Sequence, residues 1–132
     1  MLKALAHTAY HVTDMTESLR FYCEGLGLTE AFELRDDKGN PWIRYLRVAP
    51  GQFIELFYAN PQPAENISYA HLCLEVTDIQ EAVRQLREGG FPVDAEPKQG
   101  SDCNWQAWTH DPDGNRIELM QYHPDCPQLA TH

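Results

Sequence analysis

Two histidines and two glutamates stand at matched positions of an internal repeat, and together they could bind a metal. A shift of 64 residues places His7 on His71, and eight of the nineteen positions from 7 to 25 are then identical. A shift of 63 places Glu55 on Glu118, each within the triplet Ile-Glu-Leu. Imidazole and carboxylate groups suit divalent cations such as Ni, Co, Zn, Mn or Fe. If a pseudo-twofold axis relates the two copies, the four side chains can converge on one open, catalytic centre.

The position of each glutamate within a strand-like run favours this interpretation. Side chains alternate across a strand, so Glu55 shares its face with Phe53 and Phe57 while its aliphatic neighbours point to the other face. An unpaired carboxylate in an apolar core is costly. A single histidine or glutamate in a strand is more often a solvated or structural residue than a ligand. The repetition of both residue types at matched positions therefore predicts that they face a polar or metal-lined cavity.

The elements that must position these side chains follow the same order in both copies. Asp14 and Asp78 have the pattern of helix caps, because each is followed three residues later by a glutamate. We expect helices over about 14–25 and 78–90, and strands near 4–12, 28–34, 42–48, 52–59, 69–76, 91–96, 104–110 and 115–122. Asp-rich turns at 36–41 and 111–115 predict hairpins. Each copy is thus a βαβββ module, and the fold class is α+β with the helices on one face of curved sheets.

The length and the charge of the chain limit the classes of protein to which it can belong. At 132 residues the chain is expected to be one domain, with modules at about 4–59 and 68–122, a linker at about 60–67 and a loose tail at 123–132. The net charge of −10 argues against a nucleic-acid or anionic-membrane surface. No apolar run approaches the length of a membrane span. The four cysteines form no Cys-x-x-Cys pair, which indicates reduced thiols and a cytoplasmic protein.

At these residues the chain resembles the vicinal oxygen chelate superfamily, which includes glyoxalase I, bleomycin-resistance proteins, fosfomycin-resistance enzymes and extradiol dioxygenases. The resemblance spans about residues 4–122 and is strongest to the short bacterial glyoxalase I (lactoylglutathione lyase) type. The segments that carry it are His7-Thr8, Phe21-Tyr22, Gly25-Leu26-Gly27, Ile54-Glu55-Leu56, Tyr69-Ala70-His71, and Asp111-Pro112-Asp113-Gly114 before Ile117-Glu118-Leu119. The ordered set of two histidines and two glutamates is the more specific feature, because many relatives use only three ligands.

The resemblance implies a metal site and a reaction. In that family the sheets enclose a cleft around one divalent metal, here Ni, Co or Zn before Mn or Fe. Small members form homodimers, so His7 and Glu55 of one subunit would meet His71 and Glu118 of the other. The reaction converts the hemithioacetal of a 2-oxoaldehyde and a thiol into a 2-hydroxyacyl thioester. The metal stabilises an enediolate, and a glutamate loosened from it moves the proton; we assign Glu118 as the principal base and Glu55 as its counterpart.

Three further residues are candidates for binding the substrate. His11 lies on the strand face of His7, at a place where glutathione-using relatives commonly have an arginine. Asn60 approximates a family asparagine, one residue late in register, and Trp105 could form an apolar wall. The identity of the thiol is therefore left open. The alternatives are a metalloenzyme of other chemistry, either an extradiol dioxygenase or a thiol transferase, and a non-enzymatic protein that binds a small molecule.

Overall fold

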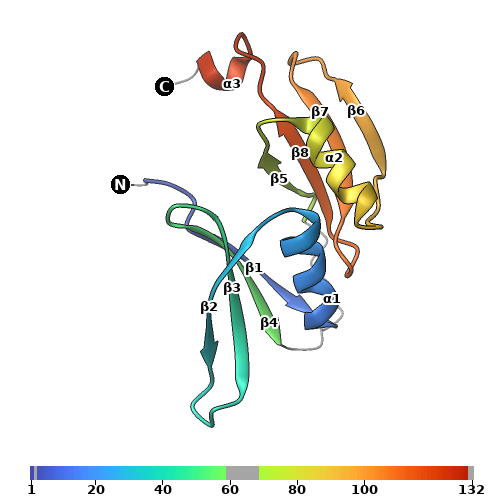
Figure 1. The fold of residues 1–132 in the computed structure, drawn as a ribbon. Helices are drawn as coiled ribbons and strands as arrows, with labels where there is room; N and C mark the ends of the chain where they lie inside the picture. Colours follow the sequence, from blue (N-terminus) through green and yellow to red (C-terminus); the bar gives the residue numbers. More distant parts are fainter. Residues whose placement is uncertain (2, 59–68, 131–132) are drawn as a thin grey trace. The chain divides into compact units, whose positions relative to one another are not determined.

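Each half of the chain folds into its own four-stranded mixed sheet with a helix. The computed structural model describes residues 1, 3–58 and 69–130, and the chain divides into two compact units, residues 1–65 and 66–132. Both units have the order β-α-β-β-β, as Figure 1 shows. The prediction of an α+β fold built from two βαβββ modules is confirmed at this level. The predicted linker at about 60–67 lies outside the described residues.

The first unit joins its first and last strands side by side. Its elements are β1 (His7–Val12), α1 (Met15–Leu19), the π-helical turn η1 (Arg20–Gly25), β2 (Thr29–Arg35), β3 (Pro41–Ala49) and β4 (Gln52–Tyr58). The strand order is β1-β4-β3-β2, in which β1 and β4 are parallel and the other pairs are antiparallel. The first strand is therefore placed by its register with a strand that lies far away in the sequence.

The second unit repeats this topology. Its elements are β5 (Leu72–Glu75), α2 (Ile79–Glu88), β6 (Ala95–Gln99), β7 (Trp105–His110), β8 (Arg116–Gln121) and the short α3 (Pro127–Ala130). The order is β5-β8-β7-β6, again with one parallel pair, β5 and β8. None of the described helices combines the length and the apolar character that crossing a membrane requires.

Matching caps begin the two helices. The carboxylate of Asp14 accepts a hydrogen bond from the backbone N–H of Glu17 at 3.1 Å, and Asp78 does the same for Glu81 at 3.1 Å. Each bond satisfies one of the backbone donors that a helix leaves unpaired at its start. Both helix starts are thus confirmed as the sequence predicted them.

The aliphatic neighbours of the two glutamates form the core of their units. Ile54, Leu56, Ile117 and Leu119 are each no more than 1% exposed. In the second unit α2 packs on the sheet, where Ile79 and Val83 meet Ala107, a strand residue. The two faces of each sheet therefore differ as the alternation predicted: one is packed and apolar, and the other carries the glutamate.

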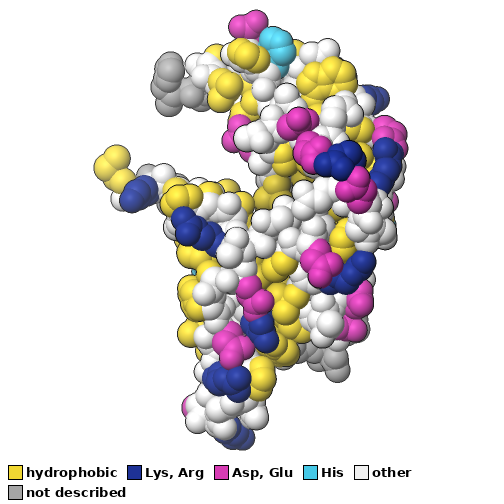
Figure 2. All heavy atoms as spheres, in the orientation of Figure 1, with side chains coloured by type: hydrophobic (Ala, Val, Ile, Leu, Met, Phe, Trp, Pro, Cys, Tyr) yellow, Lys and Arg dark blue, Asp and Glu magenta, His cyan; other side chains and the backbone are white. Residues whose placement is uncertain are grey.

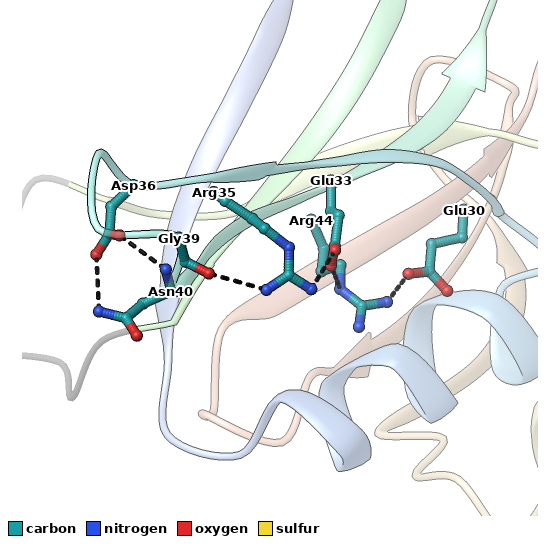
Figure 3. Close-up of polar contacts among 7 residues, drawn as sticks. All are labelled: Glu30, Glu33, Arg35, Asp36, Gly39, Asn40 and Arg44. Atoms are coloured by element: carbon teal, nitrogen blue, oxygen red, sulfur yellow. Dashed lines mark hydrogen bonds and ion pairs between the residues drawn. The ribbon is translucent and has the colours of Figure 1, made fainter.

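The β2–β3 hairpin carries a charged network on its surface (Figure 3). Arg44 forms ion pairs with Glu30 and, at 3.0 Å, with Glu33, and Arg35 joins Glu33 at 2.9 Å. Figure 2 shows basic and acidic side chains interleaved over this hairpin. Because β2 is an edge strand, these charges discourage another strand from pairing with it.

Two regions differ from the sequence prediction. The strand expected near 91–96 lies instead at 95–99, because Val93 packs against the core under α2 and the polar residues that follow form the edge strand. The tail, expected to be loose, makes contacts with the second unit as far as Gln128. Cys126 is 1% exposed, and the side chain of Asn104 accepts a hydrogen bond from the His123 N–H and donates one to Gln128.

Candidate functional site

His7 and Glu55 meet on the face of the first sheet that is opposite the buried residues Ile54 and Leu56. The parallel register of β1 and β4 sets His7 opposite Phe53 and Ala9 opposite Glu55. His7 Nε2 lies 2.5 Å from Glu55 Oε2. Glu55 is only 4% exposed, whereas half of the histidine side chain is open to solvent. A buried carboxylate thus faces an accessible imidazole.

His71 and Glu118 form the equivalent pair in the second unit. His71 directly precedes β5, and the parallel register of β5 and β8 sets Cys73 opposite Glu118. His71 Nε2 lies 3.6 Å from Glu118 Oε1, and Glu118 is 7% exposed. The structure therefore brings together each of the two histidine–glutamate pairs that the repeat singled out.

The donor atoms of the first pair fit a cation. Oε2 of Glu55 is buried and makes no hydrogen bond within the described residues, because its contact with His7 lacks hydrogen-bond geometry. Such an oxygen is costly unless a proton donor or a metal compensates it. In the described part of the chain, no group of three or more His, Cys, Asp or Glu side chains is close enough to hold a metal by itself. Each unit supplies one nitrogen and one carboxylate, and a centre with four ligands stays a prediction.

Each glutamate also has a neutral hydrogen-bond donor on a neighbouring strand. Tyr45 lies directly opposite Glu55 in the antiparallel register, so its hydroxyl is a donor within the same sheet face. Burial, followed by the effect of the Glu55 carboxylate, raises the pKa of Tyr45. Cys73 lies opposite Glu118 in the parallel register, and burial, followed by the effect of that carboxylate, raises the pKa of Cys73 to about 12.

The three predicted substrate residues have different placements. His11 lies on the same face of β1 as His7, with its ring 5.4 Å from that of Phe57. Trp105 is opposite Gln121 and so points to the other face from Glu118. Asn60 lies outside the described residues. The substrate roles of all three stay predictions.

Trp108, rather than Trp105, lies against the second pair. Its ring contacts His71 edge to face at 4.9 Å, and the guanidinium of Arg116 covers it at 4.4 Å. The tryptophan also lines a pocket of about 170 Å³, whose other walls include Lys98 and Gln106. Trp108 is the repeat counterpart of Tyr45, because a shift of 63 places Tyr45 on Trp108.

The comparisons with known proteins agree with this architecture. The family model described as the glyoxalase/bleomycin resistance protein/dioxygenase superfamily matches residues 4–119. A probable lactoylglutathione lyase of Synechocystis sp. is 30% identical over 125 residues, covering 89% of this chain and 94% of that protein. A 2-epi-5-epi-valiolone epimerase of Actinomyces sp. is 28% identical over 150 residues, covering 94% of this chain and 82% of that protein.

A solved structure extends the likeness to three dimensions. The trypanothione-dependent glyoxalase I of Leishmania major is 25% identical with a TM-score of 0.70, over 91% of this chain and 87% of that one. The family match spans nearly all of the sequence, and both sheets have the topology described above. The chain therefore belongs to the glyoxalase/bleomycin resistance protein/dioxygenase superfamily.

Proposed function

We propose that this protein is a metal-dependent isomerase of the glyoxalase I type, acting on the hemithioacetal of a 2-oxoaldehyde and a thiol. The observation that carries the proposal is the pair of matched histidine–glutamate sites, in which a buried carboxylate faces an accessible imidazole. The similarity to a probable lactoylglutathione lyase, at 30% identity over most of both chains, supports the reaction class.

The four paired side chains would hold one divalent metal, with Ni, Co or Zn expected before Mn or Fe. Their donors are two imidazole nitrogens and two carboxylates, a set that borderline divalent cations accept. When bound, the metal would polarise the adjacent oxygens of the substrate and so acidify its C–H bond. As in small members of the superfamily, the ligands would come from two subunits of a homodimer, with His7 and Glu55 from one and His71 and Glu118 from the other.

The chain's own role in the reaction is to move one proton. Glu118 would remove the proton from the carbon that bears the sulfur and return it to the neighbouring carbonyl carbon. The C–S bond stays intact. The carbon that loses the proton becomes the thioester carbonyl as its hydroxyl gives up a proton, and the other becomes a secondary alcohol as its oxygen takes one up. Glu55 would remain a ligand, because it is the more buried carboxylate and has the shorter contact with its histidine.

A second candidate is epimerisation at a carbon next to a carbonyl group. The epimerase of Actinomyces sp. that is 28% identical to this chain favours it. Epimerisation needs the same removal and return of a proton but places it back on the same carbon. A divalent metal and a glutamate base would serve either reaction.

The test combines metal analysis with turnover measurements. The purified protein is expected to bind about one metal per chain. The Ni-, Co- or Zn-loaded form is expected to convert methylglyoxal and glutathione, or another thiol, to the thioester. Ultraviolet absorbance measures the formation of the thioester. Bound metal without turnover of any 2-oxoaldehyde–thiol pair would count against the isomerase and move the search to epimerisation substrates. A lack of affinity for every metal tried would favour a non-enzymatic binding protein.

A further inference from the structure

The two glutamates are equivalent in the repeat but differ in the side chains beside them. Glu55 is flanked in register by Ala9 on β1 and Tyr45 on β3. At the corresponding positions of the second unit, Glu118 is flanked by Cys73 on β5 and Trp108 on β7. Each carboxylate therefore has one neighbour in register with a proton to donate, but this neighbour lies on opposite sides in the two units.

The partner of Glu55 is a strong donor held rigidly. Tyr45 stacks on Phe32 with ring centroids 4.2 Å apart and meets Phe53 edge to face at 5.9 Å. These ring contacts hold Tyr45 beside Glu55, its partner in the register, and a phenolic O–H is a full-strength donor. Rigid packing combined with a strong donor restricts Glu55 to a narrow range of orientations.

The partner of Glu118 is a weak donor on a short side chain. A thiol donates weakly, and Cys73 lies on the open face of its sheet. Trp108, in the place of the tyrosine, packs its ring against His71 and under Arg116. The distance from Glu118 to its histidine, 3.6 Å, is also longer than the 2.5 Å of the first pair.

We propose that Tyr45 and Cys73 are positioning residues that make the two glutamates unequal, so that Glu55 is kept as a fixed ligand and Glu118 is kept mobile enough to move the proton. This inference rests on the proposed function. It explains why a site built from two copies of one unit has a base on one side only. It also gives distinct tasks to Tyr45, which acts on the binding of the metal, and to Cys73, which acts on the proton transfer.

Two substitutions test the division of tasks. Tyr45→Phe keeps the aromatic stack but removes the hydroxyl, and it is expected to weaken Co²⁺ affinity about tenfold and to shift the visible spectrum of the Co²⁺-loaded protein. Cys73→Ala copies the residue of the first unit. It is expected to leave Co²⁺ affinity within about twofold, to lower kcat without changing KM, and to raise the primary deuterium isotope effect on kcat.

Cys73→Ser, which restores a donor at the same place, is expected to recover most of the lost kcat, and Cys103→Ser serves as a control thiol outside the site. Melting curves confirm that each variant is folded. The inference is overturned if Tyr45→Phe and Cys73→Ala change the same quantity, or if serine fails to restore what alanine removes.

The metal measurements keep this inference separable from the isomerase proposal. If the wild-type protein turns over no 2-oxoaldehyde–thiol pair, the isomerase proposal fails, while the Co²⁺ titrations still decide the division of tasks. Under that outcome, equal Co²⁺ affinity for wild type and Tyr45→Phe contradicts the inference, and a selective loss in Tyr45→Phe supports it.

Discussion

At the scale of single residues, the candidate site depends on carboxylates placed where a core residue would otherwise stand. Glu55 and Glu118 are both less than a tenth exposed, although each lies between two fully packed aliphatic residues on the other face of its strand. Removing a charged group from water in this way is costly unless a partner compensates it. Because this costly arrangement occurs in both copies of the repeat, it favours a functional role for the two glutamates.

Replacing Glu118 by glutamine tests the assignment of the base. The amide keeps the size of the side chain and an oxygen donor but cannot take up a proton, so turnover is expected to fall at least about a hundredfold while metal binding persists. Parallel assays of kcat and of metal content check both parts. Glu88→Gln, at an exposed position of α2, is the matched control and is expected to behave as wild type. Undiminished turnover in Glu118→Gln would refute the assignment.

The sequence specified the pairs but not their neighbours. His7, Glu55, His71 and Glu118 were found because repetition and strand alternation leave few interpretations for them. Trp105 and Trp108 both stand in the strand predicted near 104–110, and only the register of β7 against β8 shows that Trp108 is the one beside His71. Register is decided by the packing of the whole sheet.

At the scale of elements, two turns with the same chemistry close the antiparallel hairpins. Asp36 accepts hydrogen bonds from the backbone N–H groups of Lys38 and Asn40, and Asp111 accepts them from Asp113 and Asn115. The two turns differ in burial: Asp111 is 1% exposed, whereas its counterpart is half-buried. This difference makes the pair a matched comparison.

Asp111→Ala is expected to lower the free energy of unfolding by about 2–3 kcal/mol, because it leaves buried N–H groups without an acceptor. Asp36→Ala is expected to cost less, since water can replace the lost carboxylate. Urea unfolding followed by circular dichroism measures both. If both variants lose the same free energy of unfolding, the burial of the aspartate does not determine how much the turn stabilises the fold.

The stability that the Asp36 turn contributes is expected to depend on pH. Hydrogen bonds, first of all from the Asn40 backbone, hold the pKa of Asp36 below its usual value. A carboxyl group whose pKa is lower in the folded state stabilises the fold above its unfolded pKa of about 3.9. That contribution is lost as the pH falls through the folded value, so the difference between wild type and Asp36→Ala is expected to shrink in acid.

Local signals predicted most elements because caps and turns are short-range features. The aspartates before α1 and α2, and the aspartate turns of both hairpins, were each recognisable from a few residues. The apolar residues near 91–96 predict a strand there, but Val93 packs against the core cluster of α2 and β7, and the strand β6 begins at Ala95. The tail was misjudged because its anchor, Asn104, is distant in sequence.

At the scale of the whole molecule, each half of the chain holds half of the expected ligand set. Neither unit can supply the four ligands alone, since each contributes one histidine and one glutamate. The superfamily resemblance predicts that the halves are completed across a dimer. This arrangement has a consequence that mixing two inactive variants can reveal.

Co-expression of differently tagged His7→Ala and His71→Ala chains tests it. If each site takes its halves from different subunits, the mixed dimer has one site with both substitutions and one site with none. Purified mixed dimers are expected to recover about half the wild-type metal content and activity, although each variant alone is inactive. If instead one chain completes its own site, every site keeps one lesion and no recovery appears.

The parallel pairing of β1 with β4 also has a bearing on how the chain is made. His7 pairs with Phe53, so the first strand must wait for about 46 further residues before its partner exists. At about 5–20 residues per second, ribosomal synthesis leaves that strand without its partner for several seconds. β5 and β8 repeat the delay in the second unit. The strands at His7 and His71 are thus expected to stay without their parallel partners until most of their own unit has been made.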